Sequence, residues 1–335
     1  MLGPWTATDL IEVSNELDCL DRGGRWAVTV SFEGTATLAR FGTWEQRPPR
    51  SQEVGSWRGP DPEAWVSSLD EQSYVAAVDA VRSHISRGEV YQANICRILR
   101  TPLDPRSDIV ALHRRLVAGN PAPQSGALRL PEHGVHIASA SPELYLRRTG
   151  QRLESGPIKG TGRHPDDLLD KDRAENVMIV DLVRNDLGRV CATGSVAVPR
   201  LLAVEAHPGL VHLVSTVVGE LSPGTSWSEI LAATFPPGSV TGAPKLAAMD
   251  IIRALEAGPR GPYCGAFGWV DADAGTAELA VAIRTFWRED SGSGTKLAFG
   301  TGAGITWGSD PRAEWRETQL KAARLLHVAG EGEVR

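Results

Sequence analysis

The sequence predicts an α+β fold with antiparallel sheets, on three observations. Segments typical of strands and segments typical of helices come in separate blocks along the chain, whereas a doubly wound α/β fold would alternate them. A short turn at Thr149-Gly150 joins two consecutive strand-like segments, which favours antiparallel pairing. With 335 residues, of which 41% are hydrophobic and 23% charged, the chain is long and apolar enough to bury a large core.

Residues 1–66 are predicted to form a short N-terminal layer of sheet. Residues 25–34 and 35–42 alternate between apolar and polar side chains, like two half-buried strands joined by a turn. A polar, proline-rich stretch at 47–62 then breaks the pattern. It separates this part from a larger unit, residues 67–330.

In the larger unit, apolar residues recur at helical spacing in several segments. Helices are predicted within 67–90, 104–120, 169–188 and 308–328, and strands at 90–99 and as a meander over 126–158. The last helix can be capped by Asp310, with Pro311 in its first turn.

Charge and cysteine usage exclude several functional classes. The formal net charge of −6 argues against nucleic acid or an anionic membrane as the main partner. The cysteines show no CxxC pairing, so neither a zinc site nor a disulfide framework is indicated; they are Cys19, Cys96, Cys191 and Cys264. The N-terminus does not read as a signal peptide, and no apolar run approaches the ~20 residues of a membrane span. We therefore expect a cytoplasmic protein.

Two of the predicted helices carry acidic side chains on one face. Asp172 and Glu175 lie three residues apart, and Glu314, Glu317 and Lys321 form one stripe of the last helix. If the two faces meet, four negative charges are concentrated in one place, and Mg²⁺ suits such a site because it binds carboxylate oxygens and keeps several waters. The alternative is that both faces are simply solvated.

Glycines are unusually frequent in three later segments. They stand at Gly238, Gly242, Gly265, Gly268, Gly300, Gly302 and Gly304. Such a density is expected where backbone must approach another group closely. Successive amides at 300–304, or the start of a helix after "TGAPK", could receive a carboxylate. Tight turns are the alternative reading, and neither segment is a nucleotide-binding fingerprint.

One lysine stands apart from these groups. Lys159, in "ESGPIKGTGRHP", is wedged between Ile158 and Gly160 where a strand runs into a glycine-rich turn. From the residues alone, a solvated charge is the simplest reading.

Eight motifs in this order resemble the chorismate-binding catalytic domain. They are "PIKGTGRHP", "KDRAENVMIVDLVRNDLGRV", "HLVSTVVGEL", "FPPGSVTGAPKLAAMDII", "CGAFGW", "AIRT", "GAGI" and "EWRETQLKA". The family includes the first components of anthranilate synthase and aminodeoxychorismate synthase, and the isochorismate and salicylate synthases. The resemblance covers residues 67 to 330 and implies two large packed antiparallel sheets, helices outside, and chorismate in a central cleft.

The resemblance also assigns roles residue by residue. Glu175 and Glu317 resemble the Mg²⁺ ligands, with Asp172 and Glu314 reaching metal-bound water. Glu143 matches the acid that protonates the leaving C4 hydroxyl, and the remaining matched positions contact substrate: Arg284, Tyr263, Gly302, Ala303, Gly304, Lys321, Thr241 and His212.

Two positions discriminate among the reactions of the family. Isochorismate and salicylate synthases carry a water-activating lysine where this chain has Gln92, so ammonia is favoured over water as nucleophile. Lys159 matches the "PIKGT" of aminodeoxychorismate synthases, whereas anthranilate synthases typically have alanine there. The resemblance gives Lys159 a covalent role, in which its neutral amine attacks ring carbon C2. A purely electrostatic role for Lys159 is the alternative.

The resemblance further implies partners and leaves rival functions open. No glutaminase nucleophile or pyridoxal-phosphate lyase domain is recognised, so ammonia is expected from a separate glutamine amidotransferase subunit. Family members carry a larger N-terminal region, so neither their effector pocket nor their usual amidotransferase docking surface is expected. The leading prediction is aminodeoxychorismate synthase component I. The rivals are anthranilate synthase component I and a catalytically silent chorismate-binding subunit.

Overall fold

The structure is a computed structural model, and it describes residues 1–48, 54–162, 164–168, 170–207, 210–292 and 294–330. Parts of three predicted segments therefore lie outside the described residues. These parts are residues 49–53 of the proline-rich break, Arg163 of the glycine-rich turn, and Leu169 at the start of a predicted helix.

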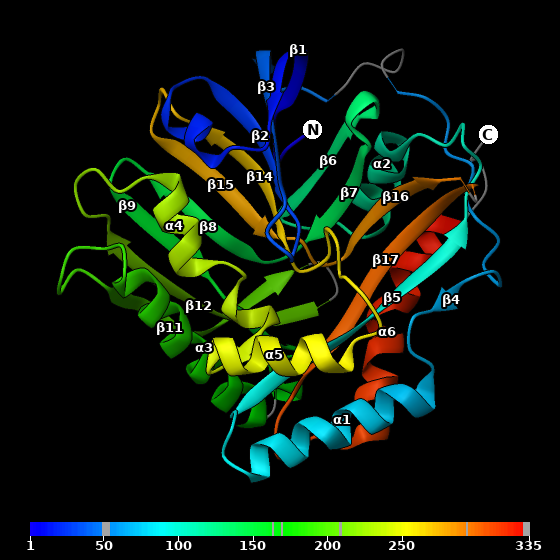
Figure 1. The fold of residues 1–335 in the computed structure, drawn as a ribbon, viewed down its shortest axis with the longest axis vertical. Helices are drawn as coiled ribbons and strands as arrows, with labels where there is room; N and C mark the ends of the chain where they lie inside the picture. Colours follow the sequence, from blue (N-terminus) through cyan, green and yellow to red (C-terminus); the bar gives the residue numbers. More distant parts are fainter. Residues whose placement is uncertain (49–53, 163, 169, 208–209, 293, 331–335) are drawn as a thin grey trace.

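Two sheets form the body of the molecule (Figure 1). Within the described residues the larger sheet has ten strands, in the order β1 (Thr6–Ser14), β3 (Ala36–Glu45), β2 (Arg25–Val30), β14 (Ala266–Asp271), β15 (Thr276–Val281), β8 (Leu144–Thr149), β9 (Arg152–Gly156), β12 (Leu210–Glu220) and β10 (Ile158–Gly162), with β11 (Ala197–His207) also beside β12. The smaller has seven, in the order β13 (Gly242–Ala243), β5 (Gln92–Pro102), β17 (Gly294–Ile305), β16 (Thr285–Ser291), β7 (Val135–Ser141) and β6 (Gln124–Leu130), with β4 (Val66–Ser67) beside β5.

The predicted fold class is confirmed. The pairings within both sheets are antiparallel, including β8 with β9 across the turn at Thr149-Gly150. The two N-terminal strands predicted at 25–42 are present as β2 and β3. They extend the larger sheet, because β2 pairs with β14 from Arg25–Asp271 to Val30–Ala266.

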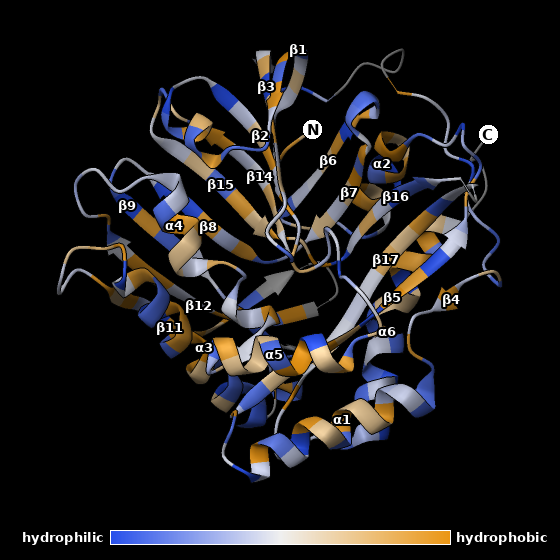
Figure 2. Ribbon diagram, in the orientation of Figure 1, coloured by the Kyte–Doolittle hydropathy of each residue, from blue (hydrophilic) through white to orange (hydrophobic). Residues whose placement is uncertain are grey.

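The predicted helices are present at 71–86, 109–119, 170–188 and 311–330. The α-helices of the described residues are α1 (Glu71–Ser86), α2 (Ile109–Gly119), α3 (Asp170–Gly188), α4 (Trp227–Thr234), α5 (Lys245–Leu255) and α6 (Pro311–Gly330). Helix α1 carries both hydrophobic and hydrophilic residues, as a half-buried helix should (Figure 2). Asp310 caps α6 as predicted, since its Oδ1 accepts a hydrogen bond from the Ala313 amide at 2.8 Å. None of the helices in the described ranges has the length and apolar character that crossing a bilayer requires.

The main core lies between the two sheets. Val28, Phe267 and Leu279 of the larger sheet and Ile137 and Ala298 of the smaller belong to one buried cluster. On the other face of the smaller sheet, side chains of α2 and α6 pack against β5, β16 and β17 in a second cluster. Helix α3 contacts β12, β10 and β11. Helices α3 and α6 therefore pack against different sheets. The four cysteines are all buried and free.

Candidate active site

Lys159 sits at an irregularity in the larger sheet. Strand β10 pairs with β12 from Ile158–Val214, but the register shifts between Lys159 and Thr161. Gly160, between them, has a φ of +74°, and a Cβ built there would lie only 2.9 Å from the Cβ of Asp172. Glycine is required at this position both for the left-handed backbone and for the close approach of α3. The predicted turn is thus a bulge that seats the start of α3 beside Lys159.

The Lys159 amine is held by a single described contact. Its Nζ donates a hydrogen bond to the Ser239 carbonyl at 3.2 Å. Burial lowers the pKa of this amine below its ordinary value, and the negative charges of Glu175 and Glu143 offset only part of that effect. A lowered pKa enlarges the neutral fraction of the amine, and neutrality is what a nucleophilic lysine requires.

Glu143 is the acidic group on the same side of the site. It lies between β7 and β8, is 4% exposed, and its Oε1 is 3.4 Å from the amide of Ile158. Burial raises its pKa to about 7, although a hydrogen bond from Ser239 and the charge of Lys159 both act in the opposite direction. At neutral pH the carboxyl group is therefore protonated part of the time, as a general acid must be.

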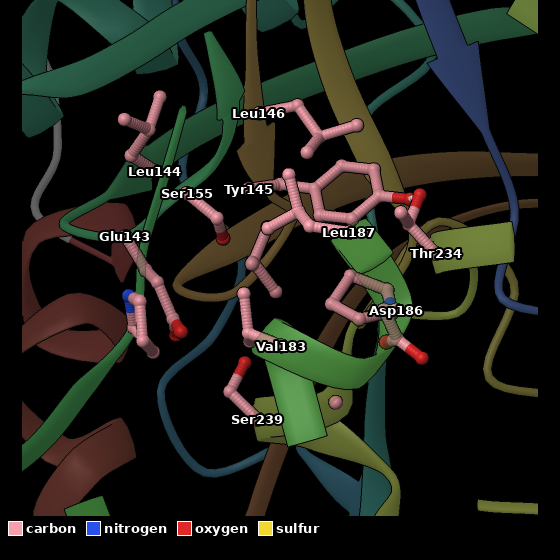
Figure 3. Close-up of a pocket in the computed structure, with 14 residues that line it drawn as sticks. Glu143, Leu144, Tyr145, Leu146, Ser155, Val183, Asp186, Leu187, Thr234 and Ser239 are labelled. Carbon is pink, nitrogen blue, oxygen red and sulfur yellow. Dashed lines mark hydrogen bonds between the residues drawn. The ribbon is translucent and has the colours of Figure 1, made fainter. Parts of the chain in front are cut away.

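The pocket in Figure 3 explains why Glu143 is so poorly solvated. Its walls come from β8, α3 and the segment 234–239, and most of its lining is apolar, including Leu144, Val183 and Leu187. Glu143 and Ser239 both lie at its edge. We interpret this pocket as the apolar wall behind Glu143, because an apolar wall favours the neutral form of a carboxyl group.

Buried hydrogen bonds fix α3 against β12. Asn176, fully buried, donates from Nδ2 to the Leu213 carbonyl at 3.2 Å and accepts a hydrogen bond from Ser215. Glu175 immediately precedes Asn176, so these hydrogen bonds also fix the position of Glu175 relative to β12. His212, 2% exposed, pairs in register with Thr161 of β10. The structure thus brings His212 within two residues of Lys159 along the β10 edge.

On α6 the predicted stripe is present, and its members have different partners. Glu314 is 4% exposed, and its Oε1 accepts a hydrogen bond from the Ser309 hydroxyl at 2.7 Å. Lys321 Nζ lies 2.7 Å from Glu317 Oε1 and donates to the Gly302 carbonyl at 3.2 Å. Lys321 therefore ties the glycine-rich end of β17 to α6.

The acidic faces of α3 and α6 lie within each other's electrostatic field. Burial raises the pKa of Glu175, and the charges of Asp172 and Glu317 raise it further. Burial alone would also raise the pKa of Glu317, but Lys321 and Lys171 outweigh it and the pKa is lowered. The charges of Glu175 and Glu317 therefore act on each other across the two helices, and Lys321 and Lys171 add positive charge beside Glu317.

The carboxylate set fits a hard cation in its chemistry. Glu175 of α3 and Glu317 of α6 interact electrostatically. Carboxylate oxygens are the ligands that Mg²⁺ prefers. Across the described ranges, no three His, Cys, Asp or Glu side chains are grouped closely enough to enclose a metal ion. A cation bound here by few protein ligands would keep several waters, as Mg²⁺ commonly does.

The glycines of β17 make room for protein side chains. A Cβ at Gly300 would lie 2.0 Å from the ring of Tyr263, and a Cβ at Gly304 would lie 2.3 Å from Nε2 of Gln92. Gly302 offers its carbonyl to Lys321, while Ala303, 2% exposed, belongs to the core beneath α1 and α5. The close approach predicted for this segment is present, and its described partners include Tyr263, Gln92, Cys96 and Lys321.

Gln92 and Thr241 are joined through Asn94. Gln92 is fully buried, and its Nε2 donates to Asn94 Oδ1 at 3.0 Å, while its Oε1 has no hydrogen-bond partner among the described residues. The backbone N–H of Asn94 donates a hydrogen bond to the Thr241 carbonyl at 2.7 Å. A buried acceptor without a partner is costly unless a ligand or water donates to it.

Arg284 is a half-buried cation with no ion pair or hydrogen bond from its side chain to any described residue. Its backbone lies in the left-handed region, with φ +51°, and its carbonyl accepts a hydrogen bond from the Ala140 amide at 3.0 Å, three residues before Glu143. A guanidinium kept partly out of water without a carboxylate is available for an anionic ligand.

Three contributors were not predicted from the sequence. Ser239 supplies the carbonyl that holds Lys159, Asn94 links Gln92 to Thr241, and Lys171 acts on the charge of Glu317. Lys171 could have been found, because it lies within the acidic motif of α3. The other two act through contacts between distant segments, for which the sequence offers no local signal.

Comparison with known proteins identifies a family and a fold for the chain. The model of the chorismate binding enzyme family matches residues 19–327. Anthranilate synthase component 1 of Streptomyces coelicolor is 41% identical over 276 residues, covering 79% of this chain and 52% of that protein. Aminodeoxychorismate synthase of Streptomyces pristinaespiralis is 41% identical over 266 residues, covering 76% and 36%.

A solved structure shares the fold. Anthranilate synthase component I from Streptococcus pneumoniae superimposes with a TM-score of 0.77 at 24% identity, over 91% of this chain and 80% of that one. This chain spans about half the length of the Streptomyces coelicolor relative that it matches.

Proposed function

The chain belongs to the chorismate-binding enzyme family, and we propose that it aminates chorismate at C4 as component I of an aminodeoxychorismate synthase. The observation that carries this proposal is Lys159, a lysine with a lowered pKa, held on the Ser239 carbonyl within the electrostatic reach of Glu143. An amine in this setting can act as a nucleophile beside a carboxyl group that can act as an acid.

The proposed reaction consists of two displacements. The neutral amine of Lys159 bonds to C2 of the ring, the double bonds shift, and the C4 hydroxyl leaves as water with a proton from Glu143. The attached lysine nitrogen returns its surplus proton to Glu143. Ammonia then bonds to C4, the double bonds shift back, and the bond between C2 and Lys159 breaks as the lysine nitrogen takes the surplus proton of the new ammonium group at C4. Chorismate and ammonia thereby give aminodeoxychorismate and water, with retention at C4.

The remaining residues would bind and orient the substrate. Arg284 has no described partner for its guanidinium, so it is the natural ligand for the enolpyruvyl carboxylate. Tyr263, which is buried, is proposed as a further contact of that carboxylate. Lys321 would add positive charge near a substrate carboxylate. The acceptor oxygen of Gln92 could accept a hydrogen bond from ammonia or from a substrate hydroxyl, but an amide cannot activate water as a base.

Mg²⁺ is proposed as the cofactor, on the electrostatic interaction between Glu175 of α3 and Glu317 of α6. Glu175 and Glu317 would hold the ion, with Asp172 and Glu314 reaching its waters. When bound, the ion would neutralise the ring carboxylate and draw electron density from the ring. The chain itself supplies the surrounding positive charge through Lys171 and Lys321.

Anthranilate synthase component I is the second candidate, because the relative from Streptomyces coelicolor carries that name at the same 41% identity. Its reaction would aminate C2 and release pyruvate, and it leaves Lys159 without a covalent role. For either reaction we propose that ammonia comes from a separate glutamine amidotransferase subunit, as the designation component 1 of the relative suggests.

One incubation separates these candidates. The purified chain is mixed with chorismate, Mg²⁺ and ammonium, and the products are separated and weighed, with pyruvate assayed in parallel. Aminodeoxychorismate without pyruvate is expected. Anthranilate with an equal amount of pyruvate would establish the second candidate instead, and the absence of any product would favour a silent binding subunit.

A further inference from the structure

An arginine and a glutamate are buried together on the edge of β5. The Arg260 side chain is 1% exposed and that of Glu256 is 7% exposed, and they face each other at 2.6 Å. Glu256 follows α5 and Arg260 lies in the loop before β14. Removing two charges from water is costly, and a buried ion pair often stabilises a fold no better than apolar residues would. Stability alone therefore does not account for this pair.

The pair fills a gap in the smaller sheet. On this edge, β13 pairs with β5 only at Gln92 and Ala93, and β4 pairs with it only at Leu99 and Arg100. Between these positions, the Asn94 carbonyl accepts a hydrogen bond from Arg260 Nη2 at 3.1 Å. The Cys96 amide donates to Glu256 Oε1 at 2.8 Å. The two side chains thus replace the hydrogen bonds that a neighbouring strand would make.

Arg260 also holds the turn that carries Ser239. Its Nη1 donates to the Val240 carbonyl at 2.8 Å, and Val240 ends the short 3-10 helix η5 (Gly238–Val240). The carbonyl of Ser239, one residue earlier, accepts hydrogen bonds from Lys159 Nζ at 3.2 Å and from Asn94 Nδ2 at 3.1 Å. The Arg260 guanidinium therefore holds the backbone of both Asn94 and Val240. Val240 is next to Ser239, whose carbonyl accepts the hydrogen bond from Lys159.

The fork of the guanidinium is what makes this arrangement possible. Its five N–H donors lie in one plane, and here they reach a carboxylate and two carbonyls at once, while its face stacks on Phe32 at 4.1 Å. A lysine ammonium could pair with Glu256, but it could not reproduce three fixed directions.

We propose that Arg260 and Glu256 form a positioning pair that locks η5 to β5 and thereby orients the Lys159 amine for attack on the substrate. The pair acts through Ser239 and touches no reacting atom. This inference rests on the proposed function for its catalytic consequence, and it names two residues to which the family resemblance assigned no role. A displacement of about 1 Å at a reacting group lowers turnover by about 100-fold.

The test compares Arg260→Lys with Arg25→Lys. Arg25 is also shielded from water, stacked on Trp5, Trp44 and Trp269, but lies on β2 and contacts neither η5 nor β5 in the described structure. For Arg260→Lys, kcat with chorismate and ammonium is expected to fall about 100-fold. The Kd for chorismate, measured by calorimetry, is expected to stay within about threefold of the wild-type value, because the side chains proposed to bind the carboxylates of chorismate are unchanged. Arg25→Lys is expected to leave both values unchanged.

A second readout is independent of turnover. The wild-type chain has five lysines, Lys159, Lys171, Lys245, Lys296 and Lys321, so protein labelled at the lysine ε-carbon gives five resonances, and each arginine-to-lysine variant gives six. The Lys159 signal, assigned in each background by its loss when Lys159→Arg is added, is expected to move in Arg260→Lys and not in Arg25→Lys. If wild-type protein does not turn over chorismate, the proposed function fails while this measurement still tests the positioning. An unmoved Lys159 signal, or a wild-type kcat in an active Arg260→Lys enzyme, would overturn the inference.

Discussion

The candidate site has two halves that use the same residue types in opposite surroundings. In the inner half, Glu143 is buried and Lys159 half-buried, and loss of solvent moves the pKa of each toward neutrality. In the outer half, the side chains of Glu317 and Lys321 are 44% and 50% exposed and form an ion pair at 2.7 Å. Solvated ion pairs keep their charges, whereas buried groups change protonation state more easily near neutral pH.

This difference suggests a division of labour. The inner half suits bond making and proton transfer, because both require a group that is neutral part of the time. The outer half suits the binding of cations and carboxylates, because both require fixed charge. A substitution in the inner half should therefore act mainly on turnover, and one in the outer half mainly on binding.

The largest effect is expected from Lys159. Replacement by alanine or by arginine should lower the rate of aminodeoxychorismate formation by at least about 1,000-fold, since neither side chain supplies a neutral amine. Product formation measured by mass spectrometry checks this, with Lys296→Ala as a control lysine on β17. If Lys159→Arg kept activity within about tenfold of wild type, the residue would act as a charge and the covalent step would be wrong.

Removing a proposed metal ligand should come next. Glu317→Gln is isosteric but neutral, so the activity at fixed Mg²⁺ should fall by about 100-fold or more and the Mg²⁺ concentration for half activity should rise. Rates over a titration of Mg²⁺ provide the measurement, with the exposed Glu132→Gln as control. An unchanged Mg²⁺ dependence would remove Glu317 from the metal site.

The third prediction concerns Glu143 and pH. Its raised pKa of about 7 means that the carboxyl group is protonated below that pH and ionised above it, so kcat should decline as pH rises through 7. Lys159 must lose its proton to react, so the rate should also decline toward acid pH and the profile should be bell-shaped. Glu143→Gln should lower kcat by about 100-fold and abolish the alkaline decline. Persistence of that decline in Glu143→Gln would assign it to another group.

Much of this arrangement could be predicted from the sequence, for reasons that are local. Helical spacing placed Glu314, Glu317 and Lys321 on one face of α6, and a carboxylate with a proline after it marked the start of that helix. What could not be predicted depends on contacts between distant segments. Nothing local indicates that the Ser239 carbonyl meets Lys159, or that the ring of Tyr263 covers Gly300.

The smallest effect is expected from Lys321, and it tests the outer half most directly. Its ammonium is half exposed, so solvent screens its charge and its contribution to substrate binding should be about 1 kcal/mol or less, or about fivefold in KM. Lys321→Ala should therefore raise the KM for chorismate modestly, leave kcat within about threefold, and make KM less sensitive to ionic strength. Steady-state kinetics at two salt concentrations would decide the matter. A fall in kcat comparable to that of Lys159→Ala would mean that Lys321 acts on the reacting centre, and the two halves would then not divide binding from chemistry.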